Sequence, residues 1–316
     1  MTSSPRRRKV ALCAVALFLV ACASAGTTTA PAPATESRVY DTGARKWVDF
    51  RTLADAAAKA DVVFFGEQHD DPATHRAELA LLAAVGARRP NVVVSLEMFD
   101  RDVQAMLDAY LAGQLPESAF VANSRPWARY NTDYRALVEL ARANGWPVIA
   151  SNPTRRLATA VSRVGIAVLD TMAARDRAMV ARELSCPRDS YFERFAESMK
   201  GHSAGGGPPS AKDSADAAAL TWRFYEAQCV KDETMGESIA AAHAKAGQRA
   251  IVLHYNGSFH SDMGLGTAAR ARRRMSGAKS LVVTAVPVDD ITKADAVRFA
   301  HRADYVIVTP RPPKPR

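Results

Sequence analysis

The sequence places chemically versatile side chains directly after a strongly apolar run. Residues 62–65 read Val-Val-Phe-Phe, and Gly66 follows them. Glu67, His69 and Asp70 then come within four positions. The apolar run is typical of a buried parallel strand, which glycine lets the chain leave sharply. Carboxylates and an imidazole at a strand end suit metal binding or acid–base chemistry, and the plainer alternative is a loop with capping residues.

The Gly-x-x-His spacing of this cluster recurs far downstream. Gly66 and His69 form the first instance, and Gly257 and His260 form the second, after the apolar residues 250–254. Three residues beyond a glycine turn, an imidazole can point back over the end of its strand. We therefore expect both imidazoles to lie over strand ends.

Two further apolar runs also end in polar residues. Glu97 follows residues 91–96, and Asn152 follows residues 147–150. Because the carboxyl ends of parallel strands meet at one edge of a sheet, these side chains should converge with the two imidazoles. The predicted site contains Glu67, His69, Glu97 and His260, with Asp70 and Asn152 beside them.

The chemistry of this predicted site has two forms. Two close carboxylates repel each other unless a cation or an imidazolium lies between them. The site is therefore expected to hold either a divalent metal ion or a hydrogen-bonded Glu–His pair, with Asn152 as a supporting donor. The plainer alternative is that each residue is held separately in a cap, and His254, inside its strand, is expected to be structural. No HExxH, CxxC, GxSxG or P-loop motif supports serine-hydrolase or nucleotide-binding chemistry.

Alternating apolar and helical patterns predict the elements that position these residues. The fold class is α/β, with a mostly parallel central sheet flanked by helices and a helical insertion at about 186–246. The strands formed by residues 62–65 and 91–96 should be adjacent, as sequential strands usually are. Expected strands are 62–65, 91–96, 147–150, 250–254, 281–286 and 305–308, with a further short one at 166–169. Expected helices are 47–60, 72–86 capped by Asp71, 100–113 capped by Asp100, 132–144 capped by Thr132, 170–184 and 215–246, with a Gly-rich loop at 202–214.

The N-terminal residues read as a targeting segment and not as part of this fold. A basic stretch at 6–9 precedes the apolar residues 10–21, which are typical of a signal peptide. Leu19-Val20-Ala21-Cys22 resembles the lipobox of bacterial lipoproteins, so residues 1–21 should be removed and Cys22 lipidated. No acidic residue follows Cys22 directly, which favours anchoring in the outer membrane. Residues 22–37 then form a Pro/Thr-rich linker to a single domain at 38–316.

Composition and charge narrow the classes of partner. The chain has 316 residues, 48% of them hydrophobic, and a net charge of +9 that falls to +5 without the leader. This modest basic balance, with no aromatic-interleaved basic patch, does not favour nucleic acid. Cys186 and Cys229 remain in an oxidising compartment, where they form either one disulfide or two buried thiols. We predict the disulfide.

The order of these motifs resembles the ChaN-like haem-binding lipoproteins of the Tiki superfamily, over about residues 62–266. The lipobox agrees with this resemblance independently. One departure is that family members often read Gly-x-Gly-His where this chain has Asn256-Gly257-Ser258-Phe259-His260. The resemblance rests on Gly66-Glu67-Gln68-His69-Asp70, Glu97-Met98-Phe99-Asp100, residues 134–142, Ser151-Asn152, residues 228–235 and Gly257-Ser258-Phe259-His260.

This resemblance implies haem or iron uptake by a lipid-anchored outer-membrane protein. It implies haem as the cofactor, a homodimer, and an outer-membrane haem receptor as partner. The family holds haem iron through a tyrosine across a dimer, and tyrosinate is a reasonable ligand of ferric haem. The candidate haem-binding residues are Tyr130, Tyr134, Tyr225, Tyr255, His69 and His260.

The same superfamily offers a second class of function. Tiki proteases and erythromycin esterases use equivalent residues for hydrolysis, the former with a metal. Glu67, His69, Glu97 and His260 would then be catalytic and would bind a divalent metal. A haem site needs a wide apolar slot with a facing ligand, whereas a hydrolase needs these four residues within reach of one ion.

Overall fold

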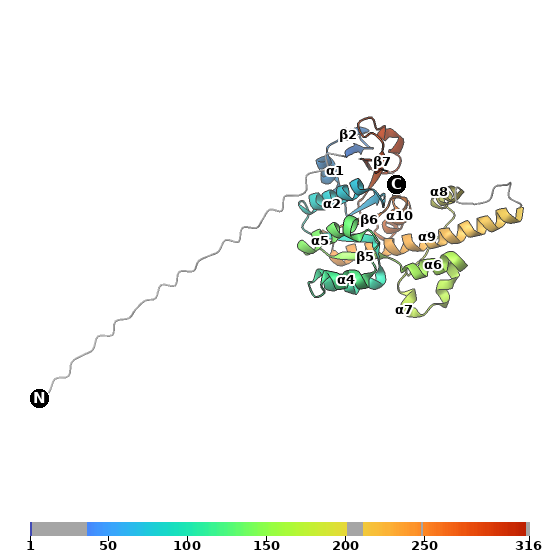
Figure 1. The fold of residues 1–316 in the computed structure, drawn as a ribbon, viewed down its shortest axis with the longest axis horizontal. Coiled ribbons are helices and arrows are strands. Elements are labelled where there is room, and N and C mark those ends of the chain that lie inside the picture. Colours follow the sequence, from blue (N-terminus) through green and yellow to red (C-terminus); the bar gives the residue numbers. More distant parts are fainter. Residues whose placement is uncertain (2–36, 201–210, 248, 314–316) are drawn as a thin grey trace.

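An eight-stranded sheet organises the computed structural model, which describes residues 1, 37–200, 211–247 and 249–313 (Figure 1). The strand order is β2-β1-β8-β7-β3-β6-β4-β5. The bounds are β1 Arg38–Asp41, β2 Lys46–Val48, β3 Val62–Glu67, β4 Val92–Asp100, β5 Val148–Asn152, β6 Ile251–Gly257, β7 Ser280–Val288 and β8 Tyr305–Pro310.

The mostly parallel α/β sheet is confirmed. All pairs among β3 to β8 are parallel, and β1 pairs antiparallel with β2 and β8. The central strands are buried along nearly their whole length, because helices cover both faces. The predicted helix at 47–60 is only partly right, since Lys46–Val48 pairs with β1 and α1 begins at Phe50.

The predicted adjacency of the two Glu-bearing strands is wrong. β6 lies between β3 and β4 and pairs in parallel with both. Sequence order favours neighbouring strands, but here a strand more than 150 residues later fills the central position. The carboxyl ends of all three strands still lie at one edge, so Glu67 and Glu97 flank the end of β6.

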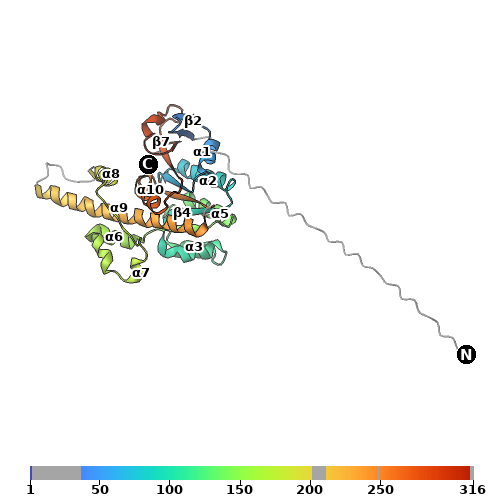
Figure 2. The ribbon, with the colours of Figure 1, turned by 180° about the vertical axis from the view of Figure 1, so that it is seen from behind.

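Helices form a layer on each face of the sheet (Figures 1 and 2). One core joins the sheet to α1, α2, α3 and α5, and a second joins the opposite face to α9 and α10. None of the described helices combines the length and apolar character needed to cross a bilayer. The bounds are α1 Phe50–Ala57, α2 Pro72–Gly86, α3 Gln104–Leu111, α4 Glu117–Ser124, α5 Arg135–Ala143, α6 Arg155–Val164, α7 Ala174–Arg177, α8 Ser190–Met199, α9 Ala211–Ala246 and α10 Gly266–Arg274.

Of the three N-cap residues predicted from the sequence, one caps its helix and two do not. Asp71 caps α2 as predicted, since its side chain accepts a hydrogen bond from the backbone of Ala73. Asp100 makes no such cap, because its carboxylate accepts the backbone N–H of Arg155 instead. Thr132 lies inside a π-helical turn, η2 (Tyr130–Tyr134), from which α5 continues.

The predicted helical segment at 215–246 is confirmed by α9, whose N-terminal half projects past the sheet in both views (Figures 1 and 2). The predicted short strand at 166–169 is wrong, because Ile166–Thr171 forms a 3-10 helix. The predicted helix at 170–184 is too long, because the structure has only the short helix α7, Ala174–Arg177, in this range. Most of the predicted Gly-rich loop lies outside the described residues, and its last residues, 211–214, begin α9.

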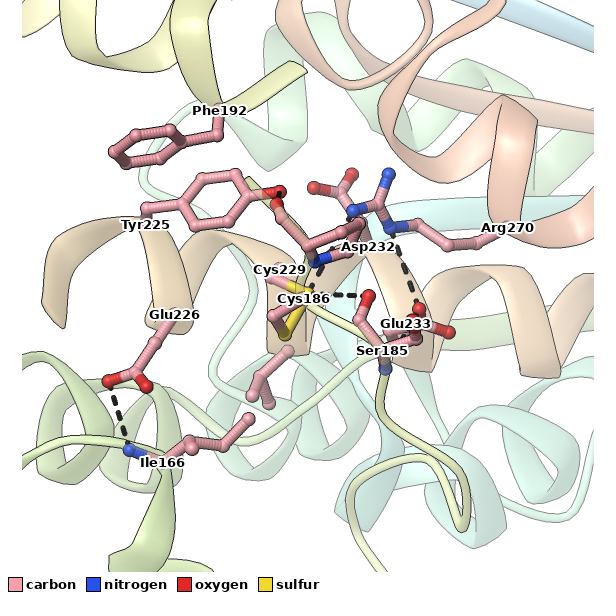
Figure 3. The surroundings of a disulfide bond; sticks show 12 residues. Ile166, Ser185, Cys186, Phe192, Tyr225, Glu226, Cys229, Asp232, Glu233 and Arg270 are labelled. Carbon is pink, nitrogen blue, oxygen red and sulfur yellow. Dashed lines mark hydrogen bonds and ion pairs between the residues drawn. A yellow bond between two sulfur atoms is a disulfide. The ribbon is translucent and has the colours of Figure 1, made fainter. Parts of the chain in front are cut away.

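The predicted disulfide is present and ties α9 to the segment before α8. Cys186 and Cys229 are bonded, with their Cα atoms 5.7 Å apart. Tyr225 lies beside the bond, while Arg270 faces Asp232 and Glu233 one turn further along α9 (Figure 3). The bond therefore fixes the stretch of α9 that carries Asp232.

Candidate functional site

The end of β3 holds the first Glu–His pair. His69 Nδ1 donates a hydrogen bond to Glu67 Oε1 at 2.5 Å, and the Tyr134 hydroxyl donates to the same oxygen at 2.8 Å. A Cβ on Gly257 would lie 2.7 Å from His69 Nε2, so only glycine leaves room for this ring. Glu67 is fully buried, but the His69 side chain keeps 48% of its exposure.

The second Glu–His pair lies between β4 and α9. His260 Nε2 is 3.4 Å from Glu97 Oε1, and His260 Nδ1 is 2.7 Å from Asp232 Oδ1. The other oxygen of Glu97 accepts the backbone N–H of Gly257 at 2.7 Å. Tyr191 and Thr267 donate hydrogen bonds to Asp232. His260 is therefore enclosed between two buried carboxylates.

The charges of both pairs follow from this enclosure. Burial disfavours the His260 imidazolium, but Glu97 and Asp232 outweigh burial and raise the pKa of His260 to about 10. Burial likewise disfavours the Glu97 carboxylate, but His260 outweighs it and holds the pKa of Glu97 well below its usual range. Burial opposes the charged form of His69 as well, yet Glu67 and Glu97 raise its pKa overall.

Gly257 is the point where the two pairs meet. Its N–H binds Glu97, and its Cα leaves the space occupied by His69. Glu67 with His69 and Glu97 with His260 therefore form two Glu–His pairs beside one glycine. Among the described residues, the compact group of metal-ligand types is instead Glu67, His75 and Glu78, with ligand atoms within 4.8 Å of one another.

The remaining predicted polar residues do not take part in either Glu–His pair. Asp70 is exposed beside His69, and Asn152 is buried with no hydrogen-bond partner for Oδ1 among the described residues. His254 is structural, as expected: it is fully buried, Ser95 Oγ lies 2.9 Å from its Nδ1, and burial lowers its pKa to about 3.

A cavity of about 910 Å³ opens beside His69. His69, Met98 and Tyr134 line it from the strand ends and η2. Trp127 lies edge-on to the His69 ring, with ring centroids 5.0 Å apart. The remaining lining residues are Asp100, Arg125, Pro126, Ala128, Arg129, Arg155, Arg156, Thr159, Ala160 and Arg163.

Five arginines give this cavity a strongly basic rim. Arg125, Arg129 and Arg156 pair with Asp102, Asp133 and Asp176 respectively. The side chains of Arg155 and Arg163 have no ion-pair partner in the described part of the chain. Both lie on α6, two turns apart and on the face that lines the cavity.

Of the four candidate tyrosines, all of them described, Tyr134 alone lines the cavity. Burial, together with the hydrogen bond to Glu67, raises the pKa of Tyr134. Tyr130 is buried in an aromatic cluster with Phe99 and Phe120. Tyr225 packs beside the disulfide, and Tyr255 is buried within the sheet core.

Asp232, Trp127 and the cavity arginines are functional candidates that the sequence did not predict. Asp232 had a weak signal, an acidic residue within the motif 228–235 of a long helix. The spacing of Arg155, Thr159 and Arg163 follows one helix face, and that pattern could have identified a basic stripe. Trp127 lies in an irregular segment, where no periodicity points to a site.

Comparisons with known proteins agree with this fold. A model of the family described as haem-binding uptake, Tiki superfamily, ChaN matches residues 53–271. The solved structure "Cofacial heme binding to ChaN of Campylobacter jejuni" is similar with a TM-score of 0.64 at 18% identity, covering 87% of this chain and 98% of that one.

A second solved structure, "The structure of the type III effector HopBA1", aligns over 83% of this chain and 93% of its own, at 13% identity and a TM-score of only 0.41. A search of curated proteins gives no significant match. The family match spans more than half of the sequence, including both Gly-x-x-His motifs. This chain therefore belongs to the haem-binding uptake family ChaN of the Tiki superfamily.

Proposed function

We propose that this chain binds haem in the arginine-rimmed cavity beside His69 and Tyr134. The observation that carries the proposal is the combination of a wide cavity, an apolar and aromatic wall and two unpaired arginines. Cavities of ligand-binding size are typically about 300–1,000 Å³, and this one lies within that range. The family of the chain points to the same ligand.

The lining suits both parts of a haem. Met98, Pro126 and Trp127 offer apolar surface to a flat macrocycle. Haem also carries two propionate carboxylates, which guanidinium groups bind through charge-assisted hydrogen bonds. Arg155 and Arg163 are placed to pair with those carboxylates.

Two cavity residues are of types that ligate haem iron, His69 and Tyr134. Glu67 binds both and would orient whichever one acts as ligand. Bound haem supplies an iron centre that is cargo in an uptake protein. The roles of Tyr130, Tyr225 and Tyr255 are then structural, since each is buried away from the cavity lining.

The membrane anchor, the oligomeric state and the partner are proposed from the sequence and from the family. Cys22 would anchor the protein in the outer membrane through its lipid, with residues 22–37 as spacer. Cofacial haem binding is described for ChaN of Campylobacter jejuni. A homodimer of this chain that brings two such cavities together, and delivery of haem to or from an outer-membrane receptor, extend the proposal.

Haemin titration tests the cavity directly. Addition of haemin to the wild-type protein should give a saturable Soret shift at micromolar concentration. Arg155→Glu combined with Arg163→Glu should weaken binding at least tenfold, because propionates would then face carboxylates. Arg51→Glu combined with Arg298→Glu, an equal total charge change on two exposed side chains, is the control. Equal affinity in the wild type and the double variant would contradict the proposed cavity.

One observation supports metal-dependent hydrolysis as a second candidate. The Glu67–His69 and Glu97–His260 pairs meet at the same strand edge, as a shared catalytic site would require. Ester and peptide hydrolysis assayed with and without added Zn²⁺ would test it. Activity lost in both Glu67→Gln and His260→Asn would support this candidate, and no metal-dependent activity would remove it.

A further inference from the structure

A buried cluster of ligand-type side chains lies behind the cavity wall. Glu67 from the end of β3 meets His75 and Glu78 from the first two turns of α2. Glu67 and Glu78 are exposed by 1% and 0%, and His75 by 5%. Tyr134, which lines the cavity, packs edge-on against His75, with ring centroids 5.0 Å apart.

Two oxygen atoms in this cluster have no partner. Glu67 Oε2 and Glu78 Oε1 are fully buried and accept no hydrogen bond from any described residue. A buried acceptor without a donor has lost its hydrogen bonds to water and gained none in return, and the cost is larger when the acceptor is charged. Two buried carboxylates side by side repel unless a cation or a shared proton lies between them. Burial and the neighbouring Glu67 raise the pKa of Glu78, so a bound ion would take the place of that proton.

One ligand atom from each of the three residues lies within 4.8 Å of the others. His75 Nδ1 is 2.9 Å from Glu78 Oε2 and 3.8 Å from Glu67 Oε2. Two ligand atoms bound at about 2.1 Å to a tetrahedral ion lie about 3.4 Å apart, between these values. Small adjustments would bring all three atoms to one centre.

Hydrogen bonds behind these atoms orient them toward that centre. His75 Nε2 lies 3.3 Å from the His69 carbonyl and 3.5 Å from Asp133 Oδ2, the partners that a metal-bound histidine commonly uses. Tyr134 and His69 occupy the other oxygen of Glu67, which leaves Oε2 facing His75. Arg129 already neutralises Asp133.

We propose that Glu67, His75 and Glu78 bind one divalent first-row metal ion, separate from haem iron. One imidazole and two carboxylates suit Zn²⁺, Mn²⁺ or Fe²⁺ better than an all-oxygen ion such as Mg²⁺. Because Glu67 also holds His69 and Tyr134, this ion would fix the orientation of both cavity residues. The site differs from the predicted set of Glu67, His69, Glu97 and His260.

Metal analysis of the untagged full chain, purified in mild detergent, tests this site. Incubation with Zn²⁺ or Mn²⁺ and then dialysis should leave one ion per chain by elemental analysis. A pyridine haemochrome assay counts haem iron separately. Glu78→Gln, which keeps the side-chain volume, and His75→Asn should each lower the retained metal at least tenfold.

Matched variants exclude other positions for the ion. His301→Gln and Glu193→Gln, on an exposed histidine and an exposed glutamate, should both retain one ion per chain. Less than 0.1 ion on the wild-type protein would overturn the proposal, whatever the folding of the variants. It would also be overturned if Glu78→Gln and His75→Asn both kept their metal. Haemin binding is measured on the same samples, so failure of the metal site and of the haem site are told apart.

Discussion

At the scale of residues, His260 is the most strongly constrained ionisable group of the strand-edge site. It lies between Glu97 and Asp232, and all three side chains are buried. Replacing one partner of a buried ion pair leaves uncompensated charge, at a typical cost of about 3–5 kcal/mol. We therefore interpret His260 first as the residue that holds β4, β6 and α9 in register at the site.

The first prediction concerns the pH dependence of stability. The pKa of His260 is raised to about 10 in the folded protein, above about 6.5 in the unfolded chain. Its contribution is therefore full below pH 6.5 and is lost as the pH rises through about 10. Urea unfolding of the wild type should show this decline, and His260→Gln should be less stable at pH 7 and lack that slope.

His301→Gln serves as the control for the pH experiment, because His301 is exposed. It should reproduce the wild-type profile. A His260→Gln variant with the wild-type slope between pH 6.5 and 10 would show that another group carries the pH dependence.

Several residues of the site could be predicted from the sequence. Gly66, His69, Gly257 and His260 were identified because a glycine turn after an apolar run has a local signature. Hydrogen-bond and ion-pair partners that come from distant elements could not be predicted. Asp232 reaches His260 only because α9 packs across the sheet, and no local pattern encodes that contact.

At the scale of elements, parallel strands were predictable because both faces are covered and the sequences are continuously apolar. Strand order was not, since β6 enters between β3 and β4 from more than 150 residues away. The antiparallel β1 and β2 were also missed. They are short, partly exposed strands at one edge of the sheet, so their sequences carry little apolar pattern.

The second prediction concerns the disulfide between α9 and the segment before α8. Cys186 and Cys229 close a loop with a sequence separation of 43, which chain-entropy reasoning equates to about 4 kcal/mol of stability. The Cys186→Ser/Cys229→Ser variant should lose stability of this order in urea unfolding. Dithiothreitol should destabilise the wild type but have no further effect on the variant.

A loss below about 1 kcal/mol in that experiment would contradict the disulfide prediction. Free-thiol counting on the denatured wild type gives an independent check. Two reactive thiols per chain at 186 and 229 would mean that the bond does not form in the cell.

At the scale of the whole molecule, the third prediction is anchoring through Cys22. Lipidation at this residue should place the wild type in the outer-membrane fraction. Dual acylation gives stable attachment, whereas a single chain gives only marginal binding. Cys22→Ser should move the protein out of the membrane fraction and leave haemin binding within twofold of wild type, because the described fold begins at residue 37.

Mass spectrometry of the mature wild-type protein provides the check on anchoring. It should show a chain that starts at Cys22 and carries acyl groups. A Cys22→Ser variant that stays in the outer membrane with the wild-type mass would contradict the proposed anchor.

Haem bound in the arginine-rimmed cavity would place its iron beside His69 and Tyr134, and the position of the iron can be measured. Crystals of the haemin-loaded protein, measured at the iron absorption edge, would give the iron position from anomalous scattering. We predict iron in the cavity, ligated by His69 or Tyr134, with propionates on Arg155 and Arg163. Iron located beside Tyr225 or Tyr255, or between molecules away from this cavity, would contradict haem binding in the cavity.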